Sequence, residues 1–84
     1  MTSRVEIYSS GLCGYCMRAK ALLDGKGVPY VEIGVDMDPG RREEMIQRSG
    51  RRTVPQIFIG ETHVGGYDDL LALEQGGELD QLLA

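Results

Sequence analysis

The chain has 84 residues, 42% of them hydrophobic and 26% charged, so we expect one globular domain over residues 1–84. A net charge of −4 argues against nucleic acid as a partner. Charges at Arg4 and Glu6, and the lack of an apolar run of about 18 residues, argue against a secretory signal and a membrane-spanning segment, so we expect no membrane partner.

The first half of the chain predicts a strand, a helix and a second strand. Residues 4–8 alternate and carry β-branched side chains, which is typical of a strand. Residues 14–25 predict a helix and residues 29–35 a second strand. The apolar positions that recur at helical spacing are Met17, Ala21, Leu22 and Leu23. A strand–helix–strand unit implies parallel strands joined by a right-handed crossover.

The middle of the chain predicts another helix and then a hairpin. Residues 38–50 indicate a helix, because Asp38 is a good N-cap and Pro39 suits the first helical position. Residues 56–59 and 63–64 flank a compact turn that contains a glycine, so they predict a β-hairpin.

The last part of the chain predicts a third helix over residues 67–75 and a short closing helix over residues 78–84. The order is therefore β-α-β-α-β-β-α, followed by the closing helix. This order predicts an α/β fold with a small mixed four-stranded sheet, flanked by helices, whose antiparallel hairpin comes last.

The only two cysteines, Cys13 and Cys16, stand at the start of the first predicted helix. Residues three apart face the same side of a helix, and helix geometry places their Cα atoms roughly 5 Å apart, within reach of a disulfide. Cys13 begins the helix, where unpaired N–H groups and the macrodipole favour a thiolate. Cys16 lies one turn deeper and is better suited to resolving a mixed disulfide than to attacking one.

Three other uses of the cysteine pair fit less well. A purely structural disulfide across so short a loop constrains the unfolded chain little. A zinc site lacks a second cysteine pair, and His63 is the only histidine. A c-type haem attachment needs a histidine directly after Cys16, where the chain has Met17. A redox-active dithiol is the favoured interpretation.

Three segments in order resemble motifs of one family. "CGYC" (residues 13–16) resembles the Cys-Pro-Tyr-Cys motif of glutaredoxins, which belong to the thioredoxin superfamily. "RTVPQIFI" (residues 52–59) resembles their Thr-Val-Pro segment with its cis proline, and "HVGGYDDL" (residues 63–70) their Gly-Gly-x-Asp motif. The spacing matches over essentially the whole chain, so the resemblance implies a single glutaredoxin domain with a thioredoxin-like fold.

The resemblance also implies a site. Cys13 and Cys16 would be the catalytic pair, and glutathione would pair with the backbone before the cis proline by strand addition. Its γ-glutamyl carboxylate would meet the start of the third helix, and Asp68, in preference to Asp69, would take its ammonium. The implied glutathione-binding residues are Tyr15, Thr53, Val54, Pro55, Gly66, Tyr67, Asp68 and Asp69.

The chain departs from the family pattern at three positions. Ser10 stands where a lysine usually meets the glycine carboxylate of glutathione, and Arg51 or Arg52 could substitute for it. Gly14 replaces the active-site proline, a loss associated in this family with dimers that share a [2Fe–2S] cluster. Tyr67 stands where some relatives carry an extra cysteine.

The expected activity is glutathione-dependent thiol–disulfide oxidoreduction of protein disulfides and of glutathione mixed disulfides, with glutathione as cosubstrate and no metal required. One alternative is a dimer that binds a [2Fe–2S] cluster through Cys13 and glutathione, for storage or transfer. Another is a redoxin reduced by a flavoprotein, against which the "GGYDDL" segment counts. We expect a cytoplasmic monomer, dimeric only if a cluster bridges two chains, whose partners are glutathione and glutathionylated or disulfide-bonded proteins.

Overall fold

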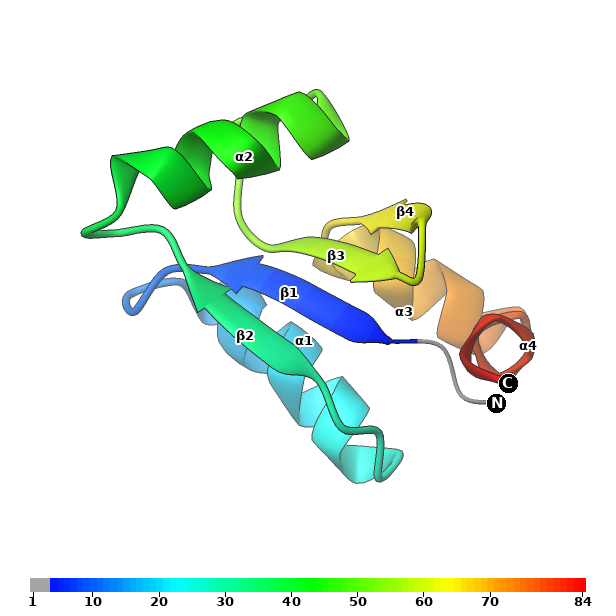
Figure 1. Ribbon diagram of the computed structural model, residues 1–84. Coiled ribbons are helices and arrows are strands. Elements are labelled where there is room, and N and C mark those ends of the chain that lie inside the picture. Colours follow the sequence, from blue (N-terminus) through cyan, green and yellow to red (C-terminus); the bar gives the residue numbers. More distant parts are fainter. Residues whose placement is uncertain (1–3) are drawn as a thin grey trace.

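The structure is a computed structural model and describes residues 4–84. These residues form four strands and four helices (Figure 1). In chain order they are β1 (Val5–Ser9), α1 (Gly14–Gly25), β2 (Val31–Gly34), α2 (Pro39–Ser49), β3 (Gln56–Ile59), β4 (Thr62–Gly65), α3 (Tyr67–Gln75) and α4 (Leu79–Leu83). The expected order is confirmed, including the short closing helix. No helix within residues 4–84 is long and apolar enough to span a membrane.

The strands form one mixed sheet in the order β2-β1-β3-β4. β1 and β2 are parallel, with Ile7 opposite Glu32, and α1 makes the crossover between them. β3 runs antiparallel to both β1 and β4. Gly60, with a positive φ of 59°, supplies the left-handed backbone of the β3–β4 turn. The predicted fold class, an α/β thioredoxin-like fold, is therefore confirmed.

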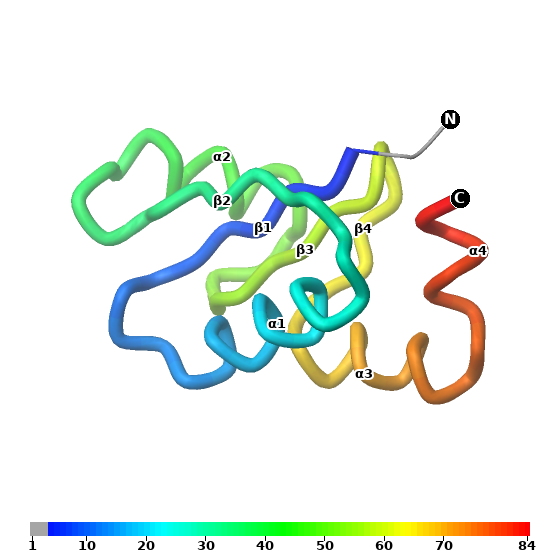
Figure 2. Tube along the Cα trace, turned by 90° about the horizontal axis from the view of Figure 1, so that it is seen from below, coloured from blue at the N-terminus to red at the C-terminus, as the bar shows by residue number. Residues whose placement is uncertain are grey.

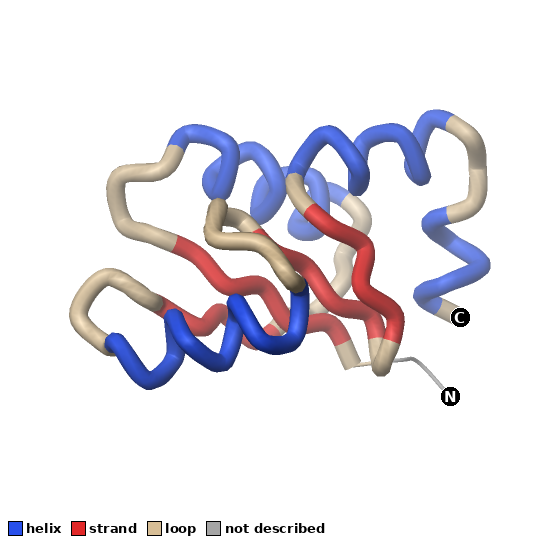
Figure 3. Tube along the Cα trace, turned by 90° about the horizontal axis from the view of Figure 1, so that it is seen from above, coloured by secondary structure: helices blue, strands red, loops and turns tan. Residues whose placement is uncertain are grey.

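Helices cover both faces of the sheet. Figures 2 and 3 view it from below and from above, and they place α2 on one face and α1 and α3 on the other. Alternate residues of the central strands accordingly feed two cores: Ile7 and Ile57 belong to the larger one, Tyr8 and Phe58 to the smaller. β1 and β3 carry apolar residues on both of their faces, as expected for central strands that helices cover on both sides.

The buried side of α1 includes only some of the apolar positions that indicated the helix: Leu23 is buried and Leu22 packs against the core. Cys16, Ala19 and Leu23 are buried, whereas Met17 is 63% exposed and Ala21 is also exposed. The helix carries apolar residues on more than one side, so the pattern identifies a helix without selecting its inner face. The contact with the sheet makes that choice, and it places Cys16 inside.

The boundaries of α2 follow the local signals. The Asp38 side chain accepts a hydrogen bond from Arg41 N at 3.1 Å, and Pro39 is the first helical residue. Gly50 ends the helix in the left-handed region, with φ 72°. These caps are local interactions, and for that reason the sequence predicted them.

Candidate active site

Cys13 is the N-cap of α1. Its backbone is extended (φ −103°, ψ 112°), and its Sγ accepts a hydrogen bond from Cys16 N at 3.1 Å, as a serine or aspartate would at such a position. The side chain is half-buried, so a substrate can reach the sulfur. An amide donor and the positive end of a helix both favour negative charge on Sγ, which is the form that attacks disulfides.

Cys16 has the opposite environment. It is 0% exposed, and burial together with a hydrogen bond to Cys13 raises the pKa of its thiol to about 12. Both cysteines are free thiols in this structure. The pair therefore consists of one accessible sulfur at the start of a helix and one buried sulfur whose thiol pKa is raised.

A shallow cleft of about 200 Å³ lies beside Cys13. The Cys13 thiol reaches its wall, since Sγ is 3.7 Å from the carbonyl oxygen of Val54. The lining residues are Tyr15, Arg51, Thr53, Val54, Pro55, Gly66, Tyr67, Asp68 and Asp69. All eight residues that the sequence assigned to glutathione are thus brought together from three separate segments, with Arg51 in addition.

One wall of the cleft is the segment before β3. The Val54–Pro55 peptide bond is cis, as expected from the resemblance. Within residues 4–84, no backbone hydrogen bond uses the N–H of Val54, and β3 begins only at Gln56. The Val54 N–H is therefore available to an extended peptide, whereas its carbonyl oxygen accepts from the Cys13 thiol.

The opposite wall is the start of α3. The Asp69 carboxylate accepts hydrogen bonds from the N–H of the N-cap Gly66, at 2.9 Å, and from Arg51 Nη1, at 3.1 Å. These two contacts, led by the Gly66 N–H, hold the pKa of Asp69 below its usual range. Gly65 has φ 117°, and a Cβ there would collide with the Asp69 carboxylate, so this turn requires glycine.

Asp68 differs from its neighbour. Its side chain is exposed, lines the cleft, and makes no ion pair with any residue that the structure describes. Asp69 serves the fold, whereas Asp68 is available to a ligand. The preference for Asp68 as the ammonium partner stays a prediction, and this geometry favours it.

The structure also separates the two arginines that could replace the missing lysine. Arg51 lines the cleft, whereas Arg52 is exposed and is not part of the lining. Ser10 does not line the cleft: its hydroxyl and the Gly11 N–H bind Asp36 and hold the pKa of that carboxyl below its usual range. Arg51 is the cation placed to meet an anionic ligand.

Sequence reasoning missed Gln56 and His63 as members of the site's surroundings. Gln56 is fully buried, and its side chain bonds Thr53 on one side and His63 on the other. The signal available was a polar residue at the first position of the otherwise apolar strand "QIFI". Within the described part of the chain, no group of three or more His, Cys, Asp or Glu side chains could hold a metal ion.

Comparison with known proteins agrees with this geometry. Residues 5–64 match the family model for glutaredoxin. The chain belongs to the glutaredoxin family. It is 58% identical to glutaredoxin 3 of Escherichia coli K12 over 81 residues, which cover 96% of this chain and 98% of that protein.

Solved glutaredoxins share the fold closely. The solution structure of a glutaredoxin from Brucella melitensis has a TM-score of 0.86 and 56% identity, covering 98% of this chain and 89% of that one. A crystal structure of a buckwheat glutaredoxin–glutathione complex has a TM-score of 0.88 and 34% identity, covering 96% and 76% of the two chains. Membership of the glutaredoxin family supports a thiol–disulfide oxidoreductase.

Proposed function

We propose that this glutaredoxin is a glutathione-dependent oxidoreductase that reduces glutathione mixed disulfides and protein disulfides. The observation that carries the proposal is the unequal pair: an accessible Cys13 at the start of α1, beside a cleft, above a fully buried Cys16. Glutathione is the cosubstrate and supplies the electrons. We place this chemistry in the cytoplasm, where thiols are kept reduced, and expect a monomer.

In the reaction with a glutathionylated protein, the Cys13 thiolate attacks the glutathione sulfur. The bond between glutathione and the target breaks, the target leaves as a thiolate and takes a proton from water, and Cys13 carries glutathione. The thiolate of a second glutathione then attacks the glutathione sulfur on Cys13. Oxidised glutathione forms, and Cys13 returns to its thiolate state.

Protein disulfides need Cys16 as well. Burial and the contact with Cys13 keep its thiol protonated in the reduced enzyme. When Cys13 is held in a mixed disulfide, its sulfur carries no negative charge and is a weaker acceptor for the Cys16 thiol hydrogen, so both contributions of Cys13 that raise the Cys16 pKa are weakened. Cys16 can then lose its proton, attack Cys13 Sγ and expel the substrate as a thiolate, which closes the Cys13–Cys16 disulfide.

The cleft offers a counterpart to each polar part of glutathione. The backbone N–H of Val54 suits the cysteinyl residue, by strand addition. The start of α3 suits the γ-glutamyl carboxylate, and Asp68, which has no ion-pair partner within residues 4–84, suits the ammonium. Arg51 takes the glycine carboxylate in place of the usual lysine.

Single cysteine substitutions test the proposal. Cys13→Ser should abolish turnover of both substrate classes, whereas Cys16→Ser should retain deglutathionylation and lose the reduction of protein disulfides. Turnover is followed with glutathione and glutathione reductase, and a parallel assay replaces both with a flavoprotein thioredoxin reductase. Activity only in the parallel assay, or activity of Cys13→Ser, would contradict the proposal.

A second candidate is a dimer that shares a [2Fe–2S] cluster, with Cys13 of each chain and the thiol of each bound glutathione as ligands. Gly14 favours it, because a Cβ at this position would meet no atom within 4 Å, so the space beside Cys13 is open. Reconstitution with iron, sulfide and glutathione, followed by absorption spectroscopy and gel filtration, tests it. A chain that stays colourless and monomeric would remove this candidate and leave the oxidoreductase.

A further inference from the structure

A buried amide connects β4 to the wall of the cleft. Gln56 is 0% exposed, and a buried amide must satisfy its donors and acceptor within the protein. Its Nε2 donates to Thr53 O at 3.0 Å and to Thr53 Oγ1 at 3.2 Å, and its Oε1 lies 2.7 Å from His63 Nε2. These bonds join His63, outside the cleft, to Thr53, which lines it.

The chemistry of the partners sets which atom donates in each hydrogen bond of this Thr53–Gln56–His63 network. The carbonyl oxygen of Thr53 only accepts, so the amide nitrogen of Gln56 must face it. The amide oxygen therefore faces His63, and the hydrogen between them must belong to His63 Nε2. The neutral imidazole is thereby held in its Nε2–H tautomer.

The same reasoning orients the Thr53 hydroxyl. Oγ1 already accepts a hydrogen from Gln56, so its own hydrogen remains to be donated. None of the hydrogen bonds among the described residues uses Thr53 Oγ1 as a donor, and Thr53 is exposed at the cleft. A ligand in the cleft therefore meets a hydroxyl whose hydrogen is free to be donated, which matches an anionic oxygen.

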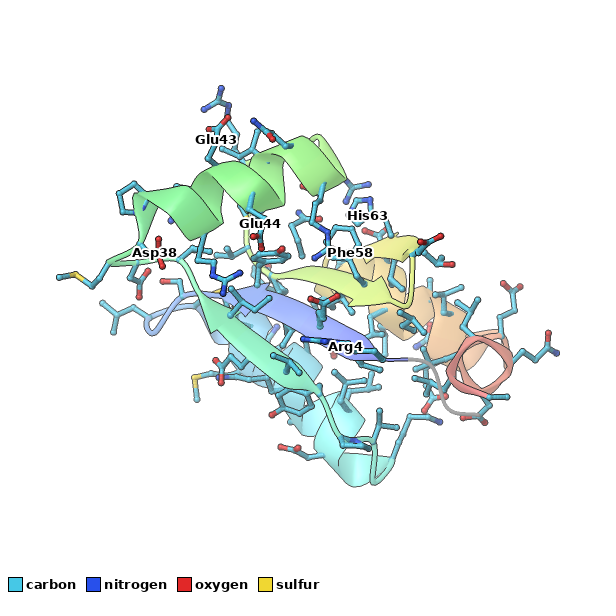
Figure 4. The ribbon with its side chains drawn as sticks, viewed as in Figure 1. Arg4, Asp38, Glu43, Glu44, Phe58 and His63 are labelled. Atoms are coloured by element: carbon cyan, nitrogen blue, oxygen red, sulfur yellow. The ribbon has the colours of Figure 1, made fainter. Side chains whose placement is uncertain are left out.

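Packing holds His63 in place. Its ring stacks on Phe58, its direct cross-strand neighbour, with the ring centroids 4.9 Å apart. Figure 4 shows both side chains on the face of the sheet that carries α2. Burial, with Arg51 and Arg48 nearby and Asp69 opposing them, keeps the pKa of His63 below its usual value, which favours the neutral ring.

We propose that Gln56 and His63 are positioning residues that keep the Thr53 hydroxyl as a hydrogen-bond donor to the cleft, which thereby selects a carboxylate at this point of its ligand. The inference rests on the proposed function, since glutathione is the ligand that supplies the carboxylate. It assigns a role in ligand selection to two residues that do not touch the ligand.

A double-mutant cycle tests the connection. Thr53→Val keeps the shape and removes the hydroxyl, and His63→Phe keeps the stacking on Phe58 and removes the donor to Gln56. Thr53→Val should raise the KM of a glutathionylated substrate by about fivefold, because it removes one hydrogen bond to a charged ligand. His63→Phe should raise KM by about threefold, because it removes the donor that holds Gln56 and through it the Thr53 hydroxyl. In both variants kcat should change little. The double variant should resemble Thr53→Val alone.

A rescue variant separates positioning from structural support. His63→Gln restores an N–H donor opposite Gln56, so it should return KM to within about twofold of the wild type. Thermal unfolding of all variants reports stability independently. Two outcomes would overturn the inference and leave the proposed function intact. One is a double variant whose increase in KM is the product of the two single increases, and the other is a His63→Gln variant whose KM is as high as that of His63→Phe. A wild-type chain with no turnover of glutathione would overturn both.

Discussion

At the scale of single residues, the arginine pair at positions 51 and 52 shows how two adjacent cations can differ. Arg51 lines the cleft and is paired with Asp69 at 3.1 Å, whereas Arg52 is exposed outside the lining. Arg51 is half exposed, so water and salt screen its attraction for an anion. Arg51 should therefore strengthen ligand binding by a small amount.

We therefore expect Arg51→Met to raise the KM of a glutathionylated substrate by about two- to fivefold at low salt, with a smaller effect at high salt. Arg52→Met removes the same charge from the neighbouring position and is the matched control, which should leave KM unchanged. The measurement is steady-state kinetics at two ionic strengths. Equal effects of the two substitutions would show that general charge, and not the position of Arg51, attracts the ligand.

At the scale of elements, the start of α3 divides two tasks between adjacent aspartates. Asp69 caps the helix through the Gly66 N–H, and Asp68 faces the cleft without a partner among residues 4–84. Asp69→Asn should lower the free energy of unfolding by about 0.3–1 kcal/mol, because the amide oxygen can still accept from the Gly66 N–H and only the charge facing Arg51 and the helix N-terminus is lost. Asp68→Asn should leave stability unchanged and raise the KM of a glutathionylated substrate.

The loss in Asp69→Asn should depend on pH in a defined direction. The folded-state pKa of Asp69 is lowered, so its stabilisation is present above its unfolded pKa of about 3.9 and is lost as the pH falls through the folded value. Wild type and Asp69→Asn should therefore differ at pH 7 and converge in acid. Chemical denaturation across this range measures the difference, and a gap that persists at the acid end would contradict the assignment.

The start of α1 allows a stabilising change. Gly14 is the first helical residue, a position that proline favours, and a Cβ there meets no atom within 4 Å. Cys13 already has the extended backbone that a residue before proline adopts. Gly14→Pro should raise the free energy of unfolding by about 0.4–1 kcal/mol, because proline lowers the conformational entropy of the unfolded chain. Urea denaturation tests this, and a lower midpoint would show that Gly14 is needed for its backbone freedom.

At the scale of the whole molecule, the two faces of the sheet are unequally packed. The larger core lies under α1, α3 and α4, whereas Met45 is the only fully buried residue of α2. The rest of the α2 contact is polar or partly exposed, including Arg48 over the Phe58 ring at 4.0 Å and the hydrogen bond from Tyr8 to Glu44. Regions with few buried apolar contacts open locally at low free energy.

Native-state hydrogen exchange should therefore show α2 opening before the sheet. We expect the best-protected amides of α2 to exchange at a lower free energy than those of β1 and β3, which should approach the global value. Met45→Ala should widen this gap, because it removes the one side chain of α2 that is fully buried. Equal protection in α2 and β3 would mean that the molecule opens as a single unit.

The sequence by itself determined the order of elements, the boundaries of α2, the fold class and the family. Each rests on local signals: Asp38 and Gly50 cap a helix through neighbouring backbone groups, and the "CGYC" segment places two thiols on one helical turn. The eight residues that the resemblance assigned to glutathione binding all line one cleft. Their roles in binding stay predictions.

Only the tertiary structure decided among residues that look alike in sequence. It chose Ala19 over Met17 for the inner side of α1, separated Arg51 from Arg52, and assigned Asp69 to the helix cap. It also joined Thr53, Gln56 and His63 through a buried amide. The physical reason is that these differences depend on contacts between segments distant in the chain, which local periodicity and capping rules do not encode.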